Sequence, residues 1–218
     1  MDRDEREPAV DCGQMAGQRQ PSVTPHGLGA PLPRSFYERP ADEVAQALLG
    51  AYCIARTSTG EGKVARIVEV EAYLGEADAA CHAARGLTPR TRTLYGPPGT
   101  AYVYLVYGVH ELFNVVCQPV GEPHAVLVRA VELCNDEPSV GAGPGKLTRA
   151  LGITREHDGT DLLTGPITLH AGRPPVRTTV TPRVGVAYAG AWAAAPLRYL
   201  DADSRAVSRP PTSRIGAP

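Results

Sequence analysis

The feature that most constrains the fold is a succession of short apolar segments separated by breaks rich in glycine and proline. Such segments, rich in Val, Ile, Tyr and Ala, are typical of strands, and breaks such as Gly108 and Pro119–Pro123 are typical of turns. The predicted strands are Tyr52–Arg56, Lys63–Ala72, Ala101–Tyr107, Leu112–Gln118, His124–Glu132, Val176–Val180 and Arg183–Tyr188. A turn at Ser58–Gly62 is expected to link the first two.

Helical patterns are confined to two short segments. Asp42–Leu49 has acidic residues at its start and Gly50 after its end, and Lys146–Leu151 follows the glycines of Gly143–Gly145. Together with the strand pattern, these segments predict an α+β fold: a single domain with a curved, mainly antiparallel β-sheet flanked by short helices.

The length of 218 residues fits one such domain, which we expect at 34–203. Residues 1–33 are rich in Pro, Gly, Gln and charge, so we expect a disordered N-terminal tail, and residues 204–218 are expected to form a flexible C-terminal tail. The first residues lack the apolar run of a secretory signal, and no apolar run is long enough to span a membrane, which predicts a cytoplasmic protein.

The five cysteines are odd in number and lack CxxC spacing, which argues against a disulfide framework and a structural zinc site. We therefore expect free thiols and no metal. The net charge is −1, of which residues 1–33 contribute −2, leaving +1 for the rest. A nearly neutral domain can still bind DNA if its charges are segregated on one face.

The residues with the most chemical potential lie between Arg66 and Tyr107. In RIVEVEAYLG, strand alternation places Ile67, Glu69, Glu71 and Tyr73 on one face, with Val68 and Val70 on the core side. Two carboxylates on one face raise a pKa unless an arginine intervenes. The structural alternative is a solvated strand edge. With the nearby tyrosines, the pattern instead favours a pocket that holds a flat aromatic ligand beside an activated water.

Three further features add to this pattern. Arg129 is a lone charge in the apolar segment VLVRAVE, so it should meet a carboxylate or a phosphate. Tyr102 and Tyr104 share one strand face, whereas Tyr107 falls on the opposite one. The segment GAGPGKLTRALG lacks the GxxxxGK[ST] spacing of a phosphate loop, but it places Lys146 near a helix N-terminus, where it is a candidate phosphate contact.

Several blocks resemble, in order and spacing, those of the alkyladenine (3-methyladenine) DNA glycosylase family. They are RIVEVEAYLG, Cys81-His82, PPGTAYVYLVYG, Asn114, VLVRAVE, GPGKLTRALG and RVGVAYAGAWAAAPLRYL. The resemblance runs from about Leu32 to about Leu200. Cys81 and the trio His110-Glu111-Leu112 depart from the pattern expected there, and Glu111 would weaken binding to phosphates unless it points away.

The resemblance implies a role for each matching residue. Glu71 would be the general base that activates a water to attack C1′ of the target nucleotide, with Arg129 and the backbone carbonyl of Val184 holding that water. Glu69 is the weaker candidate for the base, with a structural role as its alternative. The base pocket would consist of Tyr73, His82, Tyr104 and Asn114. The tyrosines would sandwich the extruded base, His82 would hydrogen-bond it, and Asn114 would exclude guanine. The DNA wedge and backbone contacts would come from Tyr107, Val109, His110 and Lys146.

The resemblance therefore implies a monomeric DNA repair glycosylase that acts on double-stranded DNA containing damaged purines. It would flip 3-methyladenine or 7-methylguanine out of the duplex, with ethenoadenine and hypoxanthine as further candidates, and leave an abasic site without a cofactor. The two lysines, Lys63 and Lys146, lie outside the matched catalytic blocks, which favours a monofunctional enzyme over a lyase.

Two other classes of function remain open at this point. A non-catalytic lesion-binding or damage-shielding module would bind lesions without turnover, and Glu71 would be dispensable. A nucleoside hydrolase would act on free nucleosides and would tolerate Tyr107→Ala.

Overall fold

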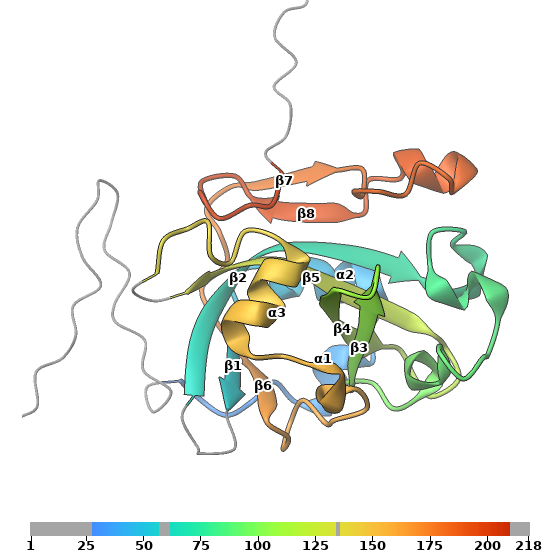
Figure 1. Cartoon of the computed structure of the whole chain (residues 1–218), viewed down its shortest axis with the longest axis horizontal. Helices are drawn as coiled ribbons and strands as arrows, with labels where there is room; N and C mark the ends of the chain where they lie inside the picture. Colours follow the sequence, from blue (N-terminus) through green and yellow to red (C-terminus); the bar gives the residue numbers. More distant parts are fainter. Residues whose placement is uncertain (1–27, 57–61, 134–135, 210–218) are drawn as a thin grey trace, which may run out of the picture.

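The computed structural model describes residues 28–56, 62–133 and 136–209, and its centre is a curled antiparallel sheet (Figure 1). The strands are β1 Tyr52–Arg56, β2 Gly62–Leu74, β3 Ala101–Val106, β4 His110–Cys117, β5 His124–Leu133, β6 Ile167–His170, β7 Thr178–Thr181 and β8 Arg198–Asp201. They follow the order β3-β4-β5-β2-β1-β6, while β8 pairs with β2 and β7 pairs with β8. The predicted α+β class and curved antiparallel sheet are confirmed.

The α-helices described are α1 Arg34–Tyr37, α2 Ala41–Leu48 and α3 Pro144–Leu151. The predictions of α2 and α3 are confirmed to within two residues, whereas α1 was not predicted. Asp42 and Glu43 lie in the first turn of α2, where acidic side chains interact favourably with the helix dipole. In α3, Pro144 occupies the start, and Gly152 ends the helix with a left-handed φ of 72°.

Strand β2, 13 residues long, organises the sheet and carries both candidate carboxylates. It pairs with β5 on one side, and on the other side with β1 at its start and with β8 from Glu69 to Glu71. The alternative interpretation of this segment as a solvated strand edge is therefore wrong, because Glu69 and Glu71 are both fully buried in the interior of the sheet.

A β-bulge interrupts the register of β2 and β5 between Ile67 and Val70. Ile67 consequently packs in the main core with Val70, whereas Val68 packs with Ala130 and Ala206 on the other side. The predicted faces of Ile67 and Val68 are therefore wrong, because a bulge adds a residue and breaks strict alternation.

Four other strand predictions need correction, and two strands were not predicted. The predicted strand Arg183–Tyr188 is a loop with turns, in which Gly185 has a φ of 78°. Val176–Val180 is replaced by β7, which begins two residues later, and β6 and β8 were missed. β3 ends before Tyr107 and β4 before Gln118, because both residues have a positive φ (52° and 69°). These conformations cannot continue a strand.

Some predictions fall wholly or partly outside the described ranges: most of the 1–33 tail, most of the turn at 58–62, Cys12, Cys134 and residues 210–218. The described chain packs beyond 203, since Ala206 is fully buried. Cys53, Cys81 and Cys117 are free and buried. Within the described ranges, no helix is long and apolar enough to cross a membrane.

Candidate active site

One cavity, of about 480 Å³, gathers most of the predicted site residues. Its walls come from the β3–β4 hairpin, from β5, from the segment 80–82 and from the loop 184–188. The predicted residues that line it are Tyr73, His82, Tyr104, Tyr107, Asn114, Arg129 and Val184. Residues from distant parts of the sequence thus meet around one space.

Glu71 lies directly behind this cavity and is held by three groups that line it. Its Oε2 accepts a hydrogen bond from the Tyr73 hydroxyl (2.9 Å) and lies 3.3 Å from Arg129 Nη1. Its Oε1 accepts a hydrogen bond from the backbone N–H of Val184 (2.7 Å). A carboxylate has about four acceptor positions, so these contacts leave room for one more donor, such as a water.

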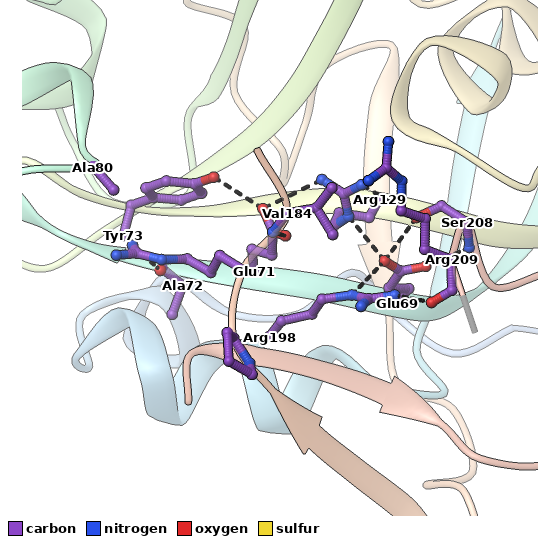
Figure 2. A network of polar contacts seen from close by, with 12 residues as sticks. Glu69, Glu71, Ala72, Tyr73, Ala80, Arg129, Val184, Arg198, Ser208 and Arg209 are labelled. Atoms are coloured by element: carbon purple, nitrogen blue, oxygen red, sulfur yellow. Dashed lines mark hydrogen bonds and ion pairs between the residues drawn. The ribbon is translucent and has the colours of Figure 1, made fainter. Parts of the chain in front are cut away.

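Glu69 anchors a second set of contacts beside Glu71 (Figure 2). Its Oε1 accepts hydrogen bonds from Arg129 Nε and Arg198 Nε, each at 2.8 Å. Burial opposes ionisation of Glu69, but Arg129, Ser208 and Arg198 outweigh it and lower the pKa of this carboxyl group. Glu69 is therefore a charged structural partner of the arginines, and two arginines balance the two buried glutamates.

A buried ion pair supports Tyr73 and the loop that carries Val184. Both terminal nitrogens of Arg183 donate hydrogen bonds to the carboxylate of Asp78, which is fully buried. Nη1 also donates to the carbonyl of Ala72. The Arg183 guanidinium lies 4.6 Å from the centre of the Tyr73 ring. Burial, and then the charge of Glu71, raises the pKa of Tyr73, so its hydroxyl stays protonated and can donate to Glu71.

His82, Tyr102 and Tyr104 form an aromatic cluster in the cavity wall. His82 Nδ1 lies 3.0 Å from the Tyr102 hydroxyl, and the His82 and Tyr104 rings meet edge to face with centroids 4.5 Å apart. Burial, and then the charges of Arg90 and Arg85, lower the pKa of His82 to about 4. His82 is consequently neutral at pH 7 and retains one N–H donor.

The depressed pKa of His82 predicts a dependence of stability on pH. Between its unfolded pKa of 6.5 and its folded pKa of about 4, His82 binds a proton only in the unfolded chain. The free energy of unfolding should therefore fall as pH decreases through this range. Urea denaturation of the wild type and of His82→Gln at pH 7.5, 6.5 and 5.5 measures the effect. We expect a shallower slope for His82→Gln, and equal slopes would contradict this account.

Asn114 is buried where β4 faces the cavity. Its Nδ2 donates to the carbonyl of Tyr102 (3.1 Å), and that of Leu112 lies 3.5 Å away. These contacts to the strand backbone fix the side chain in the wall, where it limits the shape of any ligand.

The β3–β4 hairpin presents its tip at the mouth of the cavity. Tyr107 and Gly108 both have a positive φ (52° and 70°), and Val109 N–H donates to the carbonyl of Val106. This is the pattern of a type I′ turn, which strains a tyrosine because its Cβ crowds the backbone. The Tyr107 side chain is nevertheless 92% exposed, and Val109 is 68% exposed. The turn therefore exposes an aromatic side chain to solvent, although this requires a strained backbone conformation at Tyr107.

His110 is the first residue of β4, directly after this turn, and Lys146 lies in the first turn of α3. A Cβ on Gly145 would stand 3.0 Å from the His110 ring, so the glycine lets the ring pack on the start of α3. Lys146 is exposed, with Nζ 3.3 Å from the carbonyl of Ser139. Glu111 accepts a hydrogen bond from the N–H of Arg155, which directs its carboxylate toward the 155–157 turn.

The structure adds residues that sequence reasoning did not place in the site. Tyr102, Arg90, Cys81 and Tyr188 line the cavity, and Asp78 and Arg183 support it. Tyr102 carried a signal, since it shares a face with Tyr104, and Arg183 is a lone charge in an apolar block, as Arg129 is. Cys81 is buried, which raises the pKa of its thiol to about 11, so it is protonated at pH 7 and behaves as a small apolar residue.

Comparison with known proteins adds an independent finding. The family model described as methylpurine-DNA glycosylase matches residues 35–205. A relative from Myxococcus xanthus is 52% identical over 188 residues, covering 84% of this chain and 96% of its own. Relatives from Anaeromyxobacter dehalogenans (48% identity; 85% of this chain and 89% of its own) and Methanocella arvoryzae (42%; 82% and 96%) are also similar. All three are provisionally named 3-methyladenine DNA glycosylases.

Proposed function

Because the chain belongs to the methylpurine-DNA glycosylase family, we propose that it excises alkylated or deaminated purines from duplex DNA by base flipping. The family consists of DNA glycosylases, which hydrolyse N-glycosyl bonds, and this chain is therefore a DNA repair enzyme. The proposed substrates are 3-methyladenine and 7-methylguanine, with ethenoadenine and hypoxanthine as further candidates. The proposed product is an abasic site.

In the proposed reaction, Glu71 is the general base. A water that occupies its remaining acceptor position loses a proton to the carboxylate as its oxygen bonds to C1′, and the electron pair of the breaking N-glycosidic bond goes to the base. A cationic alkylated base then leaves as a neutral molecule, whereas a neutral lesion such as hypoxanthine must also receive a proton. The contacts of Glu71 with Tyr73, Val184 and Arg129 support this role, because they fix the carboxylate without using every acceptor position. Arg129 and the carbonyl of Val184 are the proposed holders of the water.

Recognition of the base would use the aromatic wall. Stacking of a purine between Tyr73 and Tyr104 contributes about 1–3 kcal/mol, comparable with the cost of extruding a base. In the tautomer in which Nδ1 accepts a hydrogen bond from the Tyr102 hydroxyl, neutral His82 has its Nε2–H to donate to an acceptor on the purine edge. Asn114, fixed by the strand backbone, would stand against the 2-amino group of a normal guanine and disfavour it.

The hairpin tip would act on the DNA itself. Tyr107, with Val109 and His110, is the proposed wedge that fills the gap left by the extruded base, and Lys146 is the proposed contact to the phosphate backbone. The exposure of Tyr107 supports the wedge role, because insertion of this ring between bases would remove its apolar surface from water.

Tyr107→Ala should lower kcat/KM on lesion-containing duplexes about 5- to 150-fold, because the lost stacking is worth about 1–3 kcal/mol. Tyr107→Phe, which keeps the ring, should remain within about threefold of the wild type. Since Tyr107 is 92% exposed, neither change should lower the melting temperature. Full activity of Tyr107→Ala on duplexes would remove Tyr107 from the wedge role, and turnover of free nucleosides would favour a nucleoside hydrolase.

The single observation that carries the proposal is the position of Glu71, buried directly behind an aromatic-walled cavity and held by groups that line it. The proposal is tested by incubating the protein with duplexes that contain one 7-methylguanine or hypoxanthine and identifying any freed base by mass spectrometry. Release of the damaged base alone supports it. Specific binding without release would instead indicate a damage-shielding module.

A further inference from the structure

The last described residues return to the sheet and complete the charge network beside Glu71. Ala206 is fully buried against Val68 and Ala130, which fixes the segment next to the bulge of β2. Ser208 then donates its N–H to Glu69 Oε2 (2.5 Å) and its hydroxyl to Glu69 Oε1 (2.8 Å). The same hydroxyl accepts a hydrogen bond from Arg129 Nη2 (3.2 Å), as Figure 2 shows.

We propose that Ser208 is a positioning residue for excision, which holds Arg129 in the orientation that brings its Nη1 to Glu71. The inference rests on the proposed role of Glu71 as the base. Ser208 itself lies behind the glutamates and does not line the cavity, so it would act through Arg129 and Glu69.

The geometry of the guanidinium carries this inference. Arg129 is contacted at each nitrogen by a different group: Nε by Glu69, Nη2 by the Ser208 hydroxyl and Nη1 by Glu71. A guanidinium is planar and rigid, so contacts at three nitrogens determine its orientation. Without the Ser208 hydroxyl, Nη2 loses its partner, and the group can turn about the Nε contact. That rotation moves Nη1 away from Glu71.

Glu69 and Glu71 also compete for Arg129, and this competition would likewise draw Arg129 away from Glu71 if Ser208 were changed. Ser208 supplies two donors to Glu69, and Arg198, which is also hydrogen-bonded to the carbonyl of Arg209, supplies another. If the Ser208 hydroxyl is removed, Glu69 must satisfy its charge more from Arg129, at the expense of Glu71. By donating two hydrogen bonds to Glu69, Ser208 therefore leaves Arg129 Nη1 available to Glu71.

Ser208 is hydrogen-bonded to Glu69 and Arg129 and not to the other groups that face Glu71 in the described part of the chain. They are Tyr73 on β2, Tyr104 on β3, and Arg183 and the N–H of Val184 in the loop. A change in the pH–rate profile of a Ser208 variant can therefore be attributed to Arg129 and Glu69.

The test compares Ser208→Ala with Ser208→Thr, which keeps a hydroxyl, by single-turnover excision of 7-methylguanine from a duplex between pH 5 and pH 9. For Ser208→Ala we expect a rate about tenfold lower at pH 6, the loss of one hydrogen bond to a charged group. We also expect the acidic limb of the pH–rate profile to move to higher pH, with lesion binding within about threefold of wild type.

Loss of the proposed activity and loss of the Ser208 role give different results in this experiment. If the wild type excises no base at any pH, the proposed function fails. If the wild type excises bases and Ser208→Ala keeps its pH–rate profile, only the role of Ser208 fails. A uniform loss of rate at every pH, with a lower melting temperature and no shift of the acidic limb, also overturns positioning in favour of a purely structural contact. Recovery of rate and profile in Ser208→Thr supports it.

Discussion

Glu71→Gln should lower the single-turnover rate of base excision about 10²- to 10⁴-fold, the usual contribution of a general base. Glutamine is nearly isosteric, so it can still accept the hydrogen bond from Val184 N–H, but it cannot take a proton from water. Because Glu71 lies behind the cavity wall and does not line it, affinity for lesion-containing DNA should stay within about tenfold, or about 1.4 kcal/mol.

The matched control for this variant is Glu43→Gln, which neutralises an exposed carboxylate on α2 that does not line the cavity. It should excise at the wild-type rate. Circular dichroism and equilibrium binding to a hypoxanthine duplex show whether Glu71→Gln is folded and competent to bind. A folded Glu71→Gln that keeps most of its rate would remove Glu71 from the role of base.

Asp78→Ala should destabilise the protein by about 3–5 kcal/mol, the usual effect of removing one partner of a buried ion pair. Asp78 accepts hydrogen bonds from both terminal nitrogens of Arg183 and from the N–H groups of Leu74 and Ala80. Alanine would leave the buried Arg183 charge with the carbonyls of Ala72 and Trp192 and the Tyr73 ring as its contacts, and without a carboxylate hydrogen-bonded to it. It would also leave the two N–H groups unsatisfied.

The double variant Asp78→Ala/Arg183→Met is the control for this second prediction, because it removes the charge together with its partner. Urea denaturation of the wild type, the single variant and the double variant gives the three free energies of unfolding. We expect the double variant to recover part of the loss. A single variant within about 1 kcal/mol of the wild type would show that the pair contributes little.

The residues that meet around the cavity were expected in part from local signals and in part from the resemblance to the glycosylase family. A lone arginine in an apolar strand demands a partner, which identified Arg129, and strand alternation placed Glu69 and Glu71 on one face. Strand alternation predicted that Tyr107 points away from the face shared by Tyr102 and Tyr104. The sequence did not show the left-handed turn that exposes its side chain.

The remaining features depend on contacts between distant segments. The bulge of β2 arises where β1 gives way to β8, and no residue in β2 signals it. β6 and β8 are each four residues long, too short for a periodic pattern. Ser208 reaches Glu69 across 139 positions of sequence, and Arg183 reaches Asp78 across 105, so only the folded chain brings these partners together.

The most direct test of the central claim is single-turnover excision on labelled duplexes that carry one hypoxanthine, ethenoadenine or 7-methylguanine. Strand cleavage is measured before and after treatment with alkali. We predict that the wild type gives cleavage at the lesion only after alkali, and that Glu71→Gln gives none. Tight binding to the lesion without alkali-dependent cleavage by the wild type would contradict hydrolysis by a Glu71-activated water, and cleavage before alkali would contradict a monofunctional glycosylase.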